Sequence, residues 1–256
     1  MNNSPIGIFD SGIGGITIFN SIKKLLPNED VIYFSDNLHS PYGNKSIKTI
    51  KELSFKNTRW LLDKGCKIIV VACNTVTTNS ISDLRNSFNF PFIGIEPAIK
   101  SAAIKTKTGK IGILATKGTL SSSLFNSTSN DYASNIEIIE KNGDGLVQLI
   151  ENGIFEGVEI ERLLHKYLDS MIGKKIDHLV LGCTHYPFLN KILSKILPNT
   201  IKIIDSGEAV AKQTKALINK HKINKESNQG NYSFYCNGDS SSLNKILDKK
   251  YEINII

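Results

Sequence analysis

Arginine is scarce in this chain, and several common binding motifs are missing from it. Only Arg59, Arg85 and Arg162 are arginines among the 31 basic residues of the 256-residue sequence. An anionic ligand would therefore be held mainly by backbone N–H groups and hydroxyls, and not by the bidentate fork of a guanidinium group. The four cysteines form no paired CxxC motif, which argues against a zinc ribbon. No apolar run approaches the length of a membrane span, so we expect no membrane partner.

The glycine-rich segment after the first apolar run matches neither of the common nucleotide-binding motifs. Gly12-Ile13-Gly14-Gly15 is followed by Thr17 where a dinucleotide fingerprint has its third glycine, and the P-loop lysine is missing. This turn could still present N–H groups to a carboxylate. We expect that the protein needs no nucleotide, pyridoxal phosphate or metal.

The charge and the N-terminus limit the partners and the location. The formal net charge is +7, but the lysines are scattered and form no stripe interleaved with aromatic residues. We therefore expect no nucleic-acid partner. The N-terminus leads directly into an apolar strand without the h-region of a signal peptide. This indicates a cytoplasmic protein, whose cysteines stay reduced.

Short apolar runs alternate with segments of helical periodicity along the whole sequence. The expected strands cover residues 6–9, 31–35, 68–71, 91–95, 110–115, 136–139, 179–181, 201–204, 232–236 and 252–255. The expected helices cover residues 18–26, 46–64, 77–88, 98–105, 145–151, 156–171 and 207–220, with others after Pro187 and near Leu243. This alternation is typical of parallel βαβ sheets.

Two pairs of motifs recur in matching positions. Asp-Ser-Gly follows an apolar strand at Asp10 and again at Asp205, and Cys-x-Thr follows one at Cys73 and again at Cys183. The repetition predicts two similar α/β domains whose parallel sheets face each other across a central cleft. The carboxyl ends of parallel strands are where such folds bind ligands.

The matched cysteines suggest a particular chemistry. A hydrolase or transferase needs one nucleophilic thiol. Two reduced thiols on opposite sides of a planar carbanion can remove a proton from one face and deliver one to the other, which inverts the configuration. A buried structural cysteine is the alternative for each, and we assign that role to Cys66 and Cys236, which have no polar turn of this kind.

Asp10 and His185 are the ionisable neighbours of these thiols. Asp10 ends a strand inside the glycine-rich turn, where a helix cap is the simpler interpretation. His185 lies two residues after Cys183 and could handle protons for that thiol, or ligate a metal with it. Ser11, Asn74, Thr75 and Thr184 supply hydroxyl and amide groups beside them, suited to a carboxylate and an ammonium group, or to capping helices.

Five segments together resemble the glutamate racemases of the aspartate/glutamate racemase family. They are Asp-Ser-Gly-Ile-Gly-Gly from Asp10, Asp36 with Pro41-Tyr42-Gly43, Ala-Cys-Asn-Thr around Cys73, Leu-Gly-Cys-Thr-His-Tyr-Pro around Cys183, and Ile-Asp-Ser-Gly-Glu-Ala around Asp205. The resemblance covers nearly the whole chain. It implies a cofactor-independent isomerase that interconverts L- and D-glutamate and supplies D-glutamate for peptidoglycan.

The resemblance also implies roles for individual residues. The family's two catalytic cysteines match Cys73, which takes the proton from D-glutamate, and Cys183, which takes it from L-glutamate. Asp10 and His185 match the residues that assist them, and Asp36 and Glu151 match further acidic positions near the site. The implied substrate-binding residues are Asp10, Ser11, Pro41, Tyr42, Gly43, Asn74, Thr75, Thr116, Thr119, Thr184 and His185.

The family fold has two α/β domains, and its last segment returns to the first. This implies one domain from 1–97 with 207–256 and another from 98–206. We expect a homodimer. After Cys-Asn-Thr the family usually has small residues, whereas this chain has Val76-Thr77-Thr78.

Other functions share some of these features. Aspartate and hydantoin racemases would use the same two thiols. A solute-binding protein could have the same two-domain cleft but would not require a thiol on each side. A hydrolase or decarboxylase would need only one of them.

Overall fold

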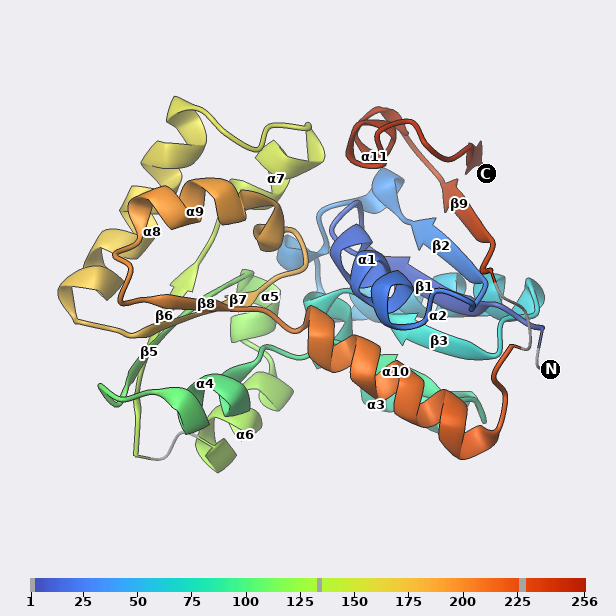
Figure 1. The fold of residues 1–256 in the computed structure, drawn as a ribbon, viewed down its shortest axis with the longest axis horizontal. Coiled ribbons are helices and arrows are strands. Elements are labelled where there is room, and N and C mark those ends of the chain that lie inside the picture. Colours follow the sequence, from blue (N-terminus) through green and yellow to red (C-terminus); the bar gives the residue numbers. More distant parts are fainter. Residues whose placement is uncertain (1–2, 133–134, 226–228) are drawn as a thin grey trace.

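Two parallel β-sheets, joined by two crossings of the chain, form the framework of the molecule. The structure, a computed structural model, describes residues 3–132, 135–225 and 229–256. One sheet has six strands and the other has four, and all their strand pairs are parallel. Figure 1 shows the two sheets side by side, each with its own helices. The predicted α/β class with two parallel sheets is confirmed.

The six-stranded sheet takes strands from both ends of the chain, in the order β10-β9-β2-β1-β3-β4. Its strands are β1 (Ile6–Asp10), β2 (Val31–Ser35), β3 (Ile68–Val71), β4 (Phe92–Gly94), β9 (Tyr232–Cys236) and β10 (Ile253–Ile255). The helices on this side are α1 (Ile16–Leu25), α2 (Ile47–Asp63), α3 (Asn74–Ser87), α10 (Gly207–His221) and α11 (Ser241–Ile246), with the short 3-10 helices η1 (Asn37–His39) and η2 (Tyr42–Asn44).

The four-stranded sheet has the order β6-β5-β7-β8. Its strands are β5 (Lys110–Ala115), β6 (Glu137–Asn142), β7 (His178–Gly182) and β8 (Lys202–Ile204). Its helices are α4 (Ile99–Lys105), α5 (Lys117–Leu120), α6 (Ser123–Tyr132), α7 (Leu146–Glu151), α8 (Val158–Gly173), α9 (Asn190–Ile196) and the 3-10 helix η3 (Tyr186–Leu189). The division into domains at 97/98 and 206/207 stays a prediction.

The central strands explain where the polar residues gather. Every residue of β1, β3 and β7 is buried, as expected for strands with helices on both faces. Polar side chains are therefore displaced to the turns that follow these strands. Because the strands of each sheet are parallel, these turns meet at one edge.

Several predicted element boundaries were wrong. The sequence predicted no helix between residues 116 and 136, yet α5 and α6 lie there. Ser, Asn and Thr dominate α6, and these residues have weak helix propensity. The burial of Phe125 against the second sheet's core anchors it instead. Helix α3 begins at Asn74 and not at Thr77, and β6 extends to Asn142.

The two crossings lie next to each other. The chain leaves the first sheet after β4 and returns after β8. The Ser206 hydroxyl, in the returning segment, donates a hydrogen bond to the Glu96 carbonyl in the outgoing one. Within the described residues, no helix combines the length and apolar character that crossing a bilayer requires.

Candidate active site

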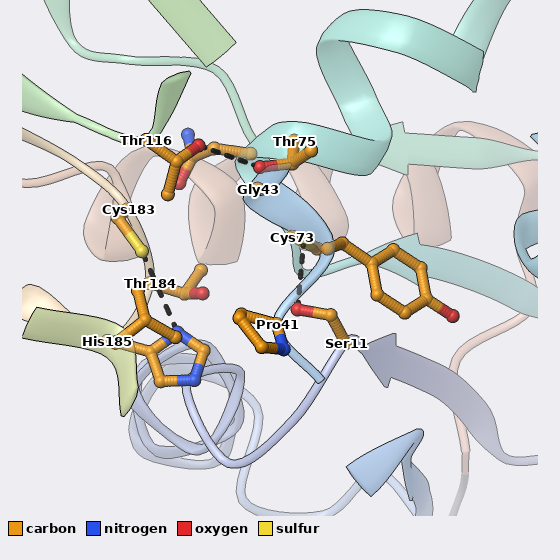
Figure 2. A pocket seen from close by; sticks show the side chains of 12 residues that line it. Ser11, Pro41, Gly43, Cys73, Thr75, Thr116, Cys183, Thr184 and His185 are labelled. Atoms are coloured by element: carbon orange, nitrogen blue, oxygen red, sulfur yellow. Dashed lines mark hydrogen bonds between the residues drawn. The ribbon is translucent and has the colours of Figure 1, made fainter. Parts of the chain in front are cut away.

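A pocket of about 270 Å³, which includes its opening to solvent, lies where the carboxyl ends of both sheets meet. Figure 2 shows Cys183 and Cys73 reaching the pocket from different sides. The lining residues are Ser11, Pro41, Tyr42, Gly43, Cys73, Asn74, Thr75, Thr116, Val147, Cys183, Thr184 and His185.

Cys73 lies between the end of β3 and the first turn of α3. Its Sγ is 3.4 Å from the Ser11 Oγ, and the same hydroxyl donates to Asp10 Oδ1 over 3.4 Å. Burial raises the pKa of the Cys73 thiol well above its ordinary value, and the nearby Asp10 carboxylate raises it further. The side-chain contact with Ser11 and the backbone hydrogen bond from Val76 oppose this rise. The thiol is therefore protonated at neutral pH.

Asp10 is fully buried behind Cys73 and does not line the pocket itself. Its Oδ2 accepts a hydrogen bond of 2.7 Å from the Gly15 N–H. Burial raises the pKa of Asp10 to about 6, against the lowering effect of the nearby His185. Asp10 thus changes charge near neutral pH, as a group that exchanges protons with a neighbour should.

Cys183 follows β7 and has a different set of neighbours. Its Sγ is 3.7 Å from His185 Nδ1, and the other ring nitrogen, Nε2, is 2.5 Å from Glu151 Oε1. Burial lowers the pKa of His185, but the interactions with Cys183 and Glu151 outweigh burial and hold that pKa well above its ordinary value. The imidazole is therefore cationic, between a sulfur and a carboxylate.

The glycine-rich turn of the first sheet packs directly against this second group. The Ile13 N–H donates a 2.9 Å hydrogen bond to Glu151 Oε1. A Cβ on Gly12 would lie 1.8 Å from Glu151 Oε1, and one on Gly14 would lie 2.4 Å from His185 Nδ1. A side chain at either position would displace the Glu151 carboxylate or the His185 ring from this arrangement. The sequence suggested that N–H groups of this turn could bind a ligand carboxylate. Two of them bind carboxylates of the protein itself: the Ile13 N–H binds Glu151 and the Gly15 N–H binds Asp10.

Asp36 supports the pocket from behind. Its carboxylate accepts hydrogen bonds from the Tyr42 hydroxyl and, over 2.5 Å, from Asn237 Nδ2, and it is 2.6 Å from His39 Nδ1. It is buried and does not line the pocket. The structure thus places Asp36 against Tyr42 of the pocket wall, and its catalytic role stays a prediction.

Threonine hydroxyls from the two sides of the molecule meet at the pocket wall. Thr75 Oγ1, on α3, is 2.8 Å from Thr116 Oγ1, which precedes α5, and Thr116 Oγ1 is 3.1 Å from Thr119 Oγ1. A dashed line in Figure 2 marks the first of these contacts. Thr119 lies behind Thr116 and is fully buried.

The pocket lining has no basic side chain other than His185, since none of its described residues is lysine or arginine. This agrees with the expectation drawn from the scarcity of arginine. Asn74 adds an acceptor, because its Oδ1 is buried and has no hydrogen-bond partner among the described residues. Buried polar atoms are rarely left unpaired, so an open acceptor in a pocket wall indicates a ligand donor.

Most predicted residues converge on this pocket, and one lining residue was missed. Asp10, Asp36, Glu151 and Thr119 lie one layer behind it, and the other predicted residues line it. Val147, on α7, also lines it. An apolar residue on an amphipathic helix is normally predicted to lie in the core, so no signal in the sequence could have marked Val147 as a pocket residue. Within the described residues, no three His, Cys, Asp or Glu side chains gather as metal ligands.

The fold and the thiol-lined pocket together define a class of protein. The family model for Asp/Glu/Hydantoin racemases matches residues 14–214. The chain therefore belongs to this family of racemases, which are isomerases.

Individual relatives narrow the comparison to glutamate racemases. The chain is 38% identical over 250 residues to the glutamate racemase of Ectopseudomonas mendocina, across 96% of this chain and 95% of that protein. The crystal structure of glutamate racemase isoform RacE1 from Bacillus anthracis matches with a TM-score of 0.91 and 28% identity, across 100% of this chain and 98% of that one. The glutamate racemase of Francisella tularensis in complex with D-glutamate matches with a TM-score of 0.87 and 31% identity, with the same coverage.

Proposed function

We propose that the protein interconverts L- and D-glutamate by a two-thiol mechanism. The observation that carries this proposal is that Cys73 and Cys183, one from each sheet, line a single small pocket. A carbon acid held between them would have a sulfur on each face. A solute-binding protein would not require this pair, and a single-thiol hydrolase would use only half of it.

The proposed reaction transfers one proton at each face of the α-carbon. Starting from L-glutamate, Cys183 as thiolate removes the α-proton and becomes a thiol, and the electron pair stays on carbon as a planar carbanion. The Cys73 thiol then donates its proton to the opposite face and becomes a thiolate. The reverse direction exchanges the two roles. Proton exchange with neighbouring groups and water resets the pair.

The two thiols have different partners for this task. Cys73 is a protonated thiol beside Ser11 and Asp10, ready to act as an acid. Cys183 lies against the cationic His185, which favours negative charge on sulfur during the reaction. Glu151 holds the imidazole in place.

The polar lining suits an amino acid with two carboxylates. Hydroxyls of Ser11, Thr75, Thr116 and Thr184 can donate to carboxylate oxygens, and Asn74 Oδ1 can accept from the ammonium group. The relatives reported above are glutamate racemases, which favours glutamate as the substrate. The family also includes racemases of aspartate and hydantoin. Chiral analysis after incubation with each compound would separate these substrates.

The cellular role extends the proposal. D-glutamate made by this reaction would supply peptidoglycan synthesis. The reaction needs both cysteines reduced, which favours the cytoplasm. The homodimer expected from the sequence stays a prediction.

The decisive test is to replace each thiol in turn. We expect Cys73→Ala and Cys183→Ala each to abolish racemisation, while the matched variant Cys236→Ala, outside the pocket, racemises normally. Wild-type enzyme in D₂O should incorporate deuterium at the α-carbon. Measurable interconversion of the enantiomers by either pocket variant would overturn the two-thiol mechanism.

A further inference from the structure

Helix α11, near the end of the chain, contacts the turn that follows α7. Ser242 Oγ donates a 2.5 Å hydrogen bond to the Glu151 carbonyl, and Lys245 Nζ donates one of 2.7 Å to the Gly153 carbonyl. Lys245 Nζ also lies 5.5 Å from the centre of the Phe155 ring. Figure 1 shows α11 on the six-stranded side and α7 on the four-stranded side, facing each other. These contacts therefore join the two halves of the molecule.

The contacts satisfy groups that α7 cannot satisfy by itself. The last carbonyls of a helix have no intrahelical donor and need partners from elsewhere. Here the Ser242 hydroxyl binds the carbonyl of Glu151, the last residue of α7, and the Lys245 ammonium binds the Gly153 carbonyl just beyond the helix, where a cation is also favourable. Gly153 has φ +71°, and a Cβ there would lie 3.3 Å from Lys245 Cδ. The turn is thus shaped to fit closely against Lys245.

Glu151 links this turn to the reacting group. Its carbonyl accepts from Ser242, while its carboxylate binds His185 Nε2 and the Ile13 N–H. His185 in turn faces the Cys183 sulfur. A shift of the end of α7 would therefore move the carboxylate that orients the imidazole.

We propose that Ser242 and Lys245 are positioning residues that hold Glu151, and through it His185, in register with Cys183. This inference rests on the proposed racemase function. Neither side chain lines the pocket, and both act through Glu151. Their main effect is on proton transfer at the Cys183 face, because the immediate partners of Cys73 are Ser11 and, through it, Asp10.

The test uses Ser242→Ala, Lys245→Met and the double variant. Loss of one hydrogen bond typically changes a rate by about two- to twelvefold, so we expect kcat/KM of the double variant to fall roughly five- to a hundredfold. A general loss of folding would also lower activity. Thermal unfolding of each variant separates a loss of folding from a loss of positioning. The single variants, which change the structure less, provide a second check.

Isotope effects on kcat/KM report which face is slowed. With α-deuterated L-glutamate, the labelled proton goes to Cys183, so the primary isotope effect should rise in the variants. With α-deuterated D-glutamate, the deuteron goes to Cys73. The isotope effect should then fall in the variants, because the later proton transfer from Cys183 limits the rate. Ser242→Thr and Lys245→Arg, which keep a donor, should retain the wild-type values, as should Lys250→Met in an exposed ion pair of the same region.

The outcomes separate this inference from the proposed function. Wild-type enzyme that does not racemise glutamate would refute the function. The positioning role alone would be refuted by a different result. In that case the wild-type enzyme racemises glutamate, but the isotope effects of the variants either do not change or rise when α-deuterated D-glutamate is the substrate.

Discussion

Asp10 shows at the level of one residue how the site trades stability for reactivity. It is fully buried, and burial raises its pKa from 3.8 to about 6. Below pH 3.8 the carboxyl is neutral in both the folded and the unfolded protein. As the pH rises towards 6 the unfolded chain ionises first, so the folded state loses relative stability. Above pH 6 the folded protein carries a buried charge.

The Asp10→Asn variant should therefore gain stability relative to wild type as the pH rises. A pKa difference of this size corresponds to about 3 kcal/mol in the free energy of unfolding. We expect the difference between variant and wild type to grow by up to that amount between pH 4 and pH 7, measured by urea unfolding. Asp248→Asn, at an exposed position, is the control. A difference that does not change with pH would show that Asp10 is not buried as a charge.

Helix α3 shows how an element joins the two sides of the pocket. Asn79 Nδ2 donates hydrogen bonds of 2.9 Å to the Gly118 carbonyl on α5 and 2.8 Å to the Thr75 carbonyl in its own helix. Gly118 packs so closely that a Cβ there would lie 3.0 Å from the Gly43 carbonyl oxygen. The helix that presents Cys73 is thus tied across the cleft to the other sheet.

We expect Asn79→Ala to weaken substrate binding while leaving the reacting groups in place. A hydrogen bond contributes about 0.5–1.5 kcal/mol net, so KM for glutamate should rise roughly two- to tenfold. Steady-state kinetics measure this, and Asn86→Ala, exposed on the same helix, should match wild type. An unchanged KM in Asn79→Ala would mean that the hydrogen bond from Asn79 to Gly118 does not support substrate binding.

At the scale of the whole molecule, the sequence predicts the two sheets and the thiols better than the contacts between the halves. Apolar runs that end at Cys73 and Cys183 mark buried strands whose carboxyl ends face the pocket. The helix around Phe125 was missed because its polar residues show little periodicity. The bond between Ser242 and Glu151 joins positions 91 residues apart and leaves no local pattern. Such contacts depend on how the chain returns to the first sheet.

A buried ion pair fixes the segment after α10, which leads back to the six-stranded sheet. The pair lies at the end of that sheet away from the pocket. Lys67 Nζ is 2.5 Å from Glu29 Oε2 and donates a 2.8 Å hydrogen bond to the Ile223 carbonyl, just after α10. The Lys225 N–H donates to Glu29 Oε1 over 3.0 Å. Both side chains of the pair are almost fully buried, at 1% and 4% exposed. The pair thus joins β2 and β3 to the segment that leads back to β9.

Lys67→Met should destabilise the fold by about 3–5 kcal/mol, because it leaves the Glu29 carboxylate buried without its cation. The double variant Lys67→Met with Glu29→Gln removes both charges and keeps an oxygen for the Lys225 N–H, so it should recover part of the loss. Urea unfolding measures both. Because the pair lies far from the pocket edge of the sheet, kcat of the folded fraction should match wild type. A double variant as unstable as the single one would show that packing, and not the unpaired charge, causes the loss.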